Sequence, residues 1–158
     1  MRFRRGCRGW GLALAALAID RISKAFVMRM NLGEILEVIP GILNFRYTRN
    51  HGAAFGFWGE HRVFLIVVAL LVCAAVLAVL FRFEKMPRPM RAGLWLIFAG
   101  GLGNVFDRIA YGFVVDFLDL AFFNFPIFNL ADTCITIGAI LAGGSLLFSD
   151  MGEKRRHG

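Results

Sequence analysis

The feature that most constrains the fold of this chain is a long apolar run at residues 63–83. Its one charged residue, Arg82, stands next to its end. At a rise of about 1.5 Å per residue, a helix of this length crosses a hydrocarbon core about 30 Å thick. The composition agrees, because 58% of residues are hydrophobic and only 18% are charged. The sequence therefore predicts an integral membrane protein rather than a soluble domain.

Two later segments are also predicted to cross the membrane. Residues 128–148 are apolar except for Asp132. Residues 90–106 are shorter and rich in glycine. Small residues of this kind let helices approach closely in lipid.

The first span, residues 10–30, is the least regular. Its apolar part ends at residue 19, so the helix has to continue through Asp20 and Lys24 to cross. These two residues are four apart and can form an ion pair on one helix face. A cleaved signal peptide is the alternative, but residues 20–24 offer no small-residue cleavage site. A retained span is predicted.

The positive charges lie in clusters beside the spans. The net charge is +7, and the basic residues gather at residues 2–8, 82–91 and 154–156. Cytoplasmic loops carry such an excess of Lys and Arg, so both termini are predicted to be cytoplasmic. The charge does not gather on one face, which argues against a nucleic-acid partner. Residues 1–158 are then one domain, an all-α membrane protein with four transmembrane helices.

A small extracytoplasmic β-sheet is predicted in the first outer loop. Residues 35–39 lead into a Pro-Gly pair, and residues 43–48 alternate between apolar and polar, which is typical of two strands about a turn. Residues 52–58 are expected at the membrane interface, with the final Trp in the aromatic belt. Residues 107–126 are expected to be a second, aromatic outer loop.

The polar residues in or near the spans all fall on the outer side of this topology. They are Asp20, Asn104, Asn129 and Asp132 in the spans, Asp107 and Arg108 at the outer end of the third span, and Asn50 and Asp116 in the loops. Polar groups are costly inside a bilayer and usually mark a functional site. Their convergence at one depth predicts a site near the outer leaflet.

Structural roles are the alternative for some of these residues. Asp20 with Lys24, and Asp107 with Arg108, can be ion pairs, and Asn50 can be a turn residue. Asp119 is expected to point to water, and His51 and His61 are taken as surface histidines. Asp132 is hardest to explain structurally, because residues 128–148 contain no basic residue.

Asp116 and Asp132 together indicate a specific chemistry. Two carboxyl groups within hydrogen-bond reach share one proton at neutral pH. The ionised group can take a proton from water while the protonated group donates to a peptide carbonyl. Such hydrolysis needs no metal, no cofactor and no protein nucleophile. The sequence also lacks a zinc-ligand spacing and a Gly-x-Ser-x-Gly motif.

Five blocks of the sequence resemble those of the lipoprotein signal peptidase (signal peptidase II) family. They are Asp20-Arg-Ile-Ser-Lys24, Asn50-His-Gly-Ala-Ala-Phe55, Gly101-Leu-Gly-Asn-Val-Phe-Asp-Arg108, Gly112-Phe-Val-Val-Asp116 and Phe128-Asn-Leu-Ala-Asp132. The blocks come in the family's order and are spread over most of the chain. This makes the resemblance specific.

The resemblance implies an aspartic peptidase of the bacterial plasma membrane. Its substrates are prolipoproteins that carry a diacylglyceryl group on a cysteine, and it cuts just before that cysteine. By position, Asp116 and Asp132 match the catalytic pair. Asn50, Asn104, Arg108 and Asn129 match residues that bind substrate or support the pair, and Asp20, Lys24 and Asp107 match further supporting positions. The implied partners are prolipoproteins and membrane lipids, and we expect a monomer.

Two other functions are the alternatives. Asp107, Gly112, Asp116 and Asp119 faintly resemble the Mg²⁺-binding motif of lipid head-group transferases, but position 120 is Leu where that motif has an acid. A proton or ion pathway needs polar groups at several depths. Below Asp132, the second and fourth spans have no charged residue apart from Arg82 at the cytoplasmic end.

Overall fold

The structure is a computed structural model that describes residues 9–52, 62–83 and 85–157. For residues 148–157 only the backbone is described. The basic residues 2–8, His61 and all but the first residue of the predicted interfacial segment 52–58 lie outside the described residues.

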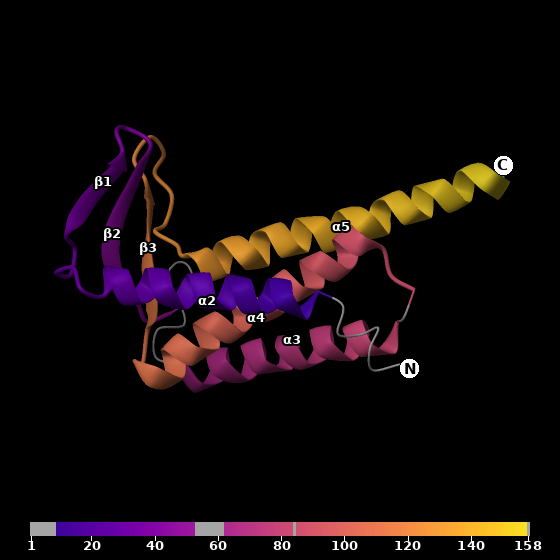
Figure 1. Ribbon diagram of the computed structural model, residues 1–158, viewed down its shortest axis with the longest axis horizontal. Helices are drawn as coiled ribbons and strands as arrows, with labels where there is room; N and C mark the ends of the chain where they lie inside the picture. Colours follow the sequence, from indigo (N-terminus) through magenta and orange to yellow (C-terminus); the bar gives the residue numbers. More distant parts are fainter. Residues whose placement is uncertain (1–8, 53–61, 84, 158) are drawn as a thin grey trace.

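Four long helices run side by side along the molecule, each antiparallel to the next (Figure 1). They are α2 (Trp10–Val27), α3 (Arg62–Arg82), α4 (Arg88–Ala110) and α5 (Leu130–His157). Helix α4 is central and packs against the other three. The four helices match the four predicted segments, although α4 runs four residues further than predicted and places Asp107 and Arg108 in its last turns.

Two parts of these helices are long and apolar enough to cross a membrane by length and composition. They are Arg62–Arg82 and Leu130–Leu147, with mean hydropathies of 3.4 and 1.6. Helix α2 carries three charged residues in its second half, and α4 has charges at both ends. Large apolar side chains of α3 and α5, such as Leu71 and Ile140, are about two-thirds exposed, which suits contact with lipid.

A three-stranded antiparallel sheet covers the end of the bundle where α2 and α4 end and α5 begins (Figure 1). Its strands are β1 (Ile35–Ile39), β2 (Leu43–Asn50) and β3 (Val114–Leu120), in that order. Strands β1 and β2 confirm the predicted pair. The third strand corrects the prediction of a loop over residues 107–126. Its first four residues are all buried, so it lacks the alternation by which a strand is recognised.

Two contacts fix the sheet relative to the bundle. An apolar cluster of Val27, Tyr47, Val115 and Phe117 joins the end of α2 to β2 and β3. Strand pairing places Thr48 opposite Asp116 and Asn50 opposite Val114. The strands thereby bring residues from both outer loops against the ends of the helices.

Helices α4 and α5 approach most closely at glycines. A Cβ atom on Gly138 would lie 2.5 Å from the backbone oxygen of Gly93, and one on Gly93 would lie 2.5 Å from that of Gly138. A Cβ on Gly100 would meet the backbone oxygen of Ala131. The glycines of residues 90–106 were predicted to let helices approach closely, and this is observed. The close packing brings the start of α5 against α4.

Candidate active site

Asn129 and Asp132 form a capping box at the start of α5. The Asn129 Oδ1 accepts a hydrogen bond from the backbone N–H of Asp132 at 2.9 Å, and Asp132 Oδ2 accepts one from the backbone N–H of Asn129 at 3.3 Å. Asn129 therefore precedes the helix, whereas the sequence analysis placed it in the first turn. The cap holds the carboxylate of Asp132 at the sheet end of the bundle.

Asp116 lies on β3 and is 2% exposed. Its Oδ2 accepts a hydrogen bond from Asn50 Nδ2 at 2.8 Å, and its Oδ1 accepts one from Asn129 Nδ2 at 2.6 Å. Asn50 also accepts a hydrogen bond from the backbone N–H of Gly52, so it is a turn residue that also donates a hydrogen bond to the carboxylate. Both oxygens of Asp116 thus accept side-chain amide N–H groups.

A network of amides joins the two carboxylates. Asn129 donates to Asp116 and caps the helix that carries Asp132. Asn104 of α4 donates from Nδ2 to Asp132 Oδ1 at 2.8 Å, and its Oδ1 lies 3.3 Å from Asn129 Nδ2. The structure therefore brings together Asn50, Asn104, Asp116, Asn129 and Asp132, as the sequence analysis expected.

The environment of Asp116 raises the pKa of its carboxyl group to about 6, compared with about 3.9 for an unperturbed Asp. Burial is the largest cause, and the neighbouring carboxylate of Asp132 adds to it. Hydrogen bonds from Asn50 and Asn129 and the charge of Lys24 act in the opposite direction. The group therefore titrates nearer to neutral pH than an ordinary Asp does, and it is largely ionised at pH 7.

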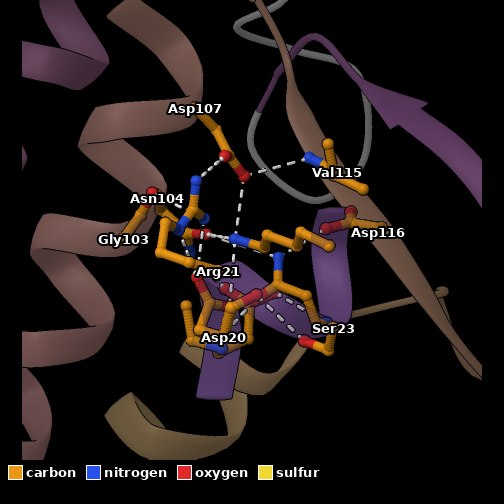
Figure 2. A network of polar contacts seen from close by, with 12 residues as sticks. Asp20, Arg21, Ser23, Gly103, Asn104, Asp107, Val115 and Asp116 are labelled. Atoms are coloured by element: carbon orange, nitrogen blue, oxygen red, sulfur yellow. Dashed lines mark hydrogen bonds and ion pairs between the residues drawn. The ribbon is translucent and has the colours of Figure 1, made fainter. Parts of the chain in front are cut away.

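A cluster of two acids and two bases, Asp20, Asp107, Arg21 and Lys24, lies beside this network (Figure 2). Asp107 accepts hydrogen bonds from Arg21 Nη1 at 2.6 Å and from the backbone N–H of Val115 at 3.2 Å, and it lies 2.8 Å from Lys24 Nζ. Asp20 lies 2.6 Å from Arg21 and 3.2 Å from Lys24.

The cluster ties four elements together. Asp20 of α2 accepts a hydrogen bond from the backbone N–H of Ala131 at the start of α5, and Asp107 of α4 accepts one from β3. The predicted pair of Asp20 and Lys24 is confirmed. Within the described residues, Asp107 pairs with Arg21 and Lys24 instead of with its neighbour Arg108, because its side chain faces α2.

Arg21 was missed by sequence reasoning. It contacts both acids of the cluster and donates to the backbone oxygen of Gly103 at 3.3 Å. The available signal was a third charge next to Asp20 inside a predicted span, which has to find a partner in the bundle. Asp119 lies elsewhere, opposite Asn44 in the sheet and partly exposed.

A cavity of about 910 Å³ opens beside the two carboxylates. Asn50, Arg108, Asp116 and Asp132 line its polar side. Phe123, Phe125, Ile127, Phe128 and Ile137 line its apolar side. Arg108 donates to the backbone oxygen of Asn104 at 3.4 Å and faces this space. The cavity has the size and mixed lining of a binding site.

Comparison with known proteins decides the family. The model of the signal peptidase (SPase) II family matches residues 12–148. The chain belongs to the signal peptidase II family. It is thus a membrane peptidase of the kind that removes signal peptides from prolipoproteins.

Several relatives share this family over most of their length. The lipoprotein signal peptidase of Symbiobacterium thermophilum is 42% identical over 130 residues, which cover 80% of this chain and 86% of the relative. That of Clostridium tetani is 33% identical over 149 residues, covering 92% and 96%. A solved bacterial membrane enzyme superposes with a TM-score of 0.83 at 35% identity, covering 87% of this chain and 86% of that one.

Proposed function

We propose that Asp116 and Asp132 are the catalytic pair of an aspartic endopeptidase that cuts prolipoproteins just before their diacylglyceryl-modified cysteine. The observation that carries the proposal is the joining of these two acids, from β3 and α5, by the amide of Asn129. Incubation of the purified protein in detergent with a diacylglyceryl-modified prolipoprotein tests it. Cleavage before the cysteine, followed as a mass shift, is the expected result.

The pair acts on a water molecule and the scissile carbonyl. The ionised acid takes a proton from water as the oxygen attacks the carbonyl carbon, and the protonated acid donates to the carbonyl oxygen. Collapse of the tetrahedral intermediate breaks the C–N bond, and the proton taken from water passes to the departing amine. Asn50, Asn104 and Asn129 hold the carboxylates, and Arg108 is placed to bind the substrate backbone.

The substrate class follows from the walls of the cavity. Its aromatic side suits the apolar part of a signal peptide and the acyl chains of a lipid-modified cysteine. Burial of such groups stabilises a complex by about 25 cal/mol per Å² of apolar surface. The exposed apolar faces of α3 and α5 allow a lipid-modified peptide to enter sideways from the bilayer.

We further propose that the enzyme is a monomer with four spans in the bacterial inner membrane. Helices α2 and α4 are less apolar than α3 and α5, but the charges near the sheet end of each helix form ion pairs inside the bundle. Asp20, Arg21 and Lys24 of α2 and Asp107 of α4 make these pairs. Paired charges that face the interior are compatible with a span. The sheet and the site then lie toward the outer leaflet.

This topology predicts opposite locations for two reporter fusions. A reporter after Gly158 is expected in the cytoplasm, and one inserted near Gly41 is expected outside, because basic segments remain on the cytoplasmic side. Paired alkaline phosphatase and fluorescent-protein fusions measure both positions. A reporter after Gly158 that is active only outside would refute the topology.

Full activity is expected after exhaustive chelation with EDTA. In the described part of the chain, no group of three or more His, Cys, Asp or Glu side chains is arranged to hold a metal ion. A pair of acids activates water without a metal. The measurement is the cleavage rate before and after chelation. Loss of activity that Mg²⁺ restores would favour the head-group transferase.

A further inference from the structure

The buried ammonium group of Lys24 has three acceptors. Its Nζ lies 2.8 Å from Asp107 Oδ2, 3.0 Å from Asn104 Oδ1 and 3.2 Å from Asp20 Oδ1. The side chain is 1% exposed. An ammonium group has three N–H donors and no acceptor, so these contacts match its full capacity.

Asn104 connects this cation with Asp132. Because Lys24 can only donate, the side-chain oxygen of Asn104 has to face it, and the NH₂ group then faces Asp132, to which it donates at 2.8 Å. Asn129 Nδ2, at 3.3 Å from the same oxygen, imposes the same orientation. A flipped amide would set donor against donor in a buried place, which costs about 1–3 kcal/mol for each unsatisfied group.

With the Asn104 amide in this orientation, one carboxylate oxygen of the acid pair differs from the other three. Both oxygens of Asp116 and Oδ1 of Asp132 accept side-chain N–H groups at 2.6–2.8 Å. Among the described contacts, Asp132 Oδ2 accepts only the backbone N–H of Asn129, at 3.3 Å. Short N–H donors favour an ionised oxygen, so the shared proton is best accommodated on Asp132 Oδ2.

We infer that Lys24 is a positioning residue, which acts through Asn104 to place the shared proton on Asp132 Oδ2 and leaves Asp116 as the base. The inference rests on the proposed function of the acid pair. Among the described residues, two cations face the pair, Lys24 from α2 and Arg108 from α4, and the acids Asp20 and Asp107 contact Lys24. Lys24 contacts the side-chain oxygen of Asn104, whereas Arg108 contacts the backbone oxygen of that residue.

The test is Lys24→Gln, which removes the charge and supplies an amide that both donates and accepts. We expect kcat to fall about 100-fold with little change in KM, because the variant disturbs the geometry of the acids and not the substrate cavity. Both limbs of the pH–rate profile should move up by about one unit, since carboxyl groups hold protons more tightly without a nearby cation. Lys24→Arg, still charged and donor-only, should return the limbs toward their original position.

Arg21→Met is the matched control. Arg21 contacts the same acids, Asp20 and Asp107, but has no described contact with Asn104 or the catalytic pair. The variant should unfold at a lower temperature while the pH limbs of its activity stay in place. Unmoved limbs in folded Lys24→Gln would overturn the inference and leave the catalytic pair intact. Activity of Asp116→Asn or Asp132→Asn would instead refute the proposed function.

A second variant covers a failure of Lys24→Gln to fold. Lys24→Met combined with Asp107→Asn keeps the charge cluster balanced, with Asp107→Asn alone as its reference. The same upward shift of both pH limbs is expected relative to that reference. Failure of both Lys24 variants to fold, when Arg21→Met and Asp107→Asn fold, would make Lys24 a structural residue and overturn the inference.

Discussion

Asp116→Asn and Asp132→Asn are each expected to abolish cleavage, with a loss of roughly 10⁴-fold or more. An amide can neither take a proton from water nor share one, although it keeps the shape of the side chain. Both variants should stay folded, because an amide in place of Asp132 still offers an oxygen to Asn104, and an amide in place of Asp116 still accepts from either Asn50 or Asn129. The lost acceptor at Asp116 should lower the unfolding temperature of that variant. The measurements are the cleavage rate by mass shift and the unfolding temperature in detergent.

Asp119→Asn is the matched control for these variants. Asp119 is three residues from Asp116 on the same strand, so the two side chains point to opposite faces of the sheet. This variant should retain most of the activity. The double variant of Asp116 and Asp132 should be hardly worse than either single one, because the two acids act as a unit. Near-normal cleavage by folded Asp132→Asn would exclude the pair as the catalytic group.

The pH dependence of the wild-type rate should also reflect a shared proton. The pKa of Asp116 is raised to about 6. Activity should therefore fall as the pH drops through this region and the base becomes protonated. At alkaline pH the shared proton is lost and the rate should fall again. The two apparent pKa values belong to the pair as a whole.

The sequence was sufficient to predict the four helices of the bundle, although length and apolarity alone define only α3 and α5 among the described residues. It was also sufficient to place the polar residues at one end, since charged groups in a membrane helix have to face the interior. Asn129 illustrates the limit. Its place near the start of the fourth span was visible, but its capping role and its bridge between Asp116 and Asp132 depend on a strand that was not predicted.

The missing strand and the misassigned ion pair have physical causes. Strand β3 is buried at its first four residues, so its sequence lacks alternation. The structural alternative in the sequence analysis was an ion pair between Asp107 and Arg108, which are adjacent in sequence. In the structure Asp107 contacts α2, because residues next to one another on a helix point in different directions.

Gly138→Val is expected to abolish cleavage by forcing α4 and α5 apart. A Cβ atom at this position would lie 2.5 Å from the backbone oxygen of Gly93 and 3.0 Å from the backbone nitrogen of Ile97. Backbone atoms cannot rotate away as a side chain can, so the helices have to separate. Overpacking of this kind costs about 1–3 kcal/mol or more. A shift of about 1 Å at the 2.8 Å contact between Asn104 and Asp132 would add a loss of about 100-fold in rate.

Gly143→Val is the matched control, because Gly143 lies on the same helix and a Cβ atom there would meet nothing within 4 Å. Its unfolding temperature and cleavage rate should remain close to those of the unmodified protein. Both quantities are measured for the two variants in the same detergent. If Gly138→Val had the same unfolding temperature and cleavage rate as Gly143→Val, the hypothesis that close packing of α4 on α5 positions Asp132 would be wrong.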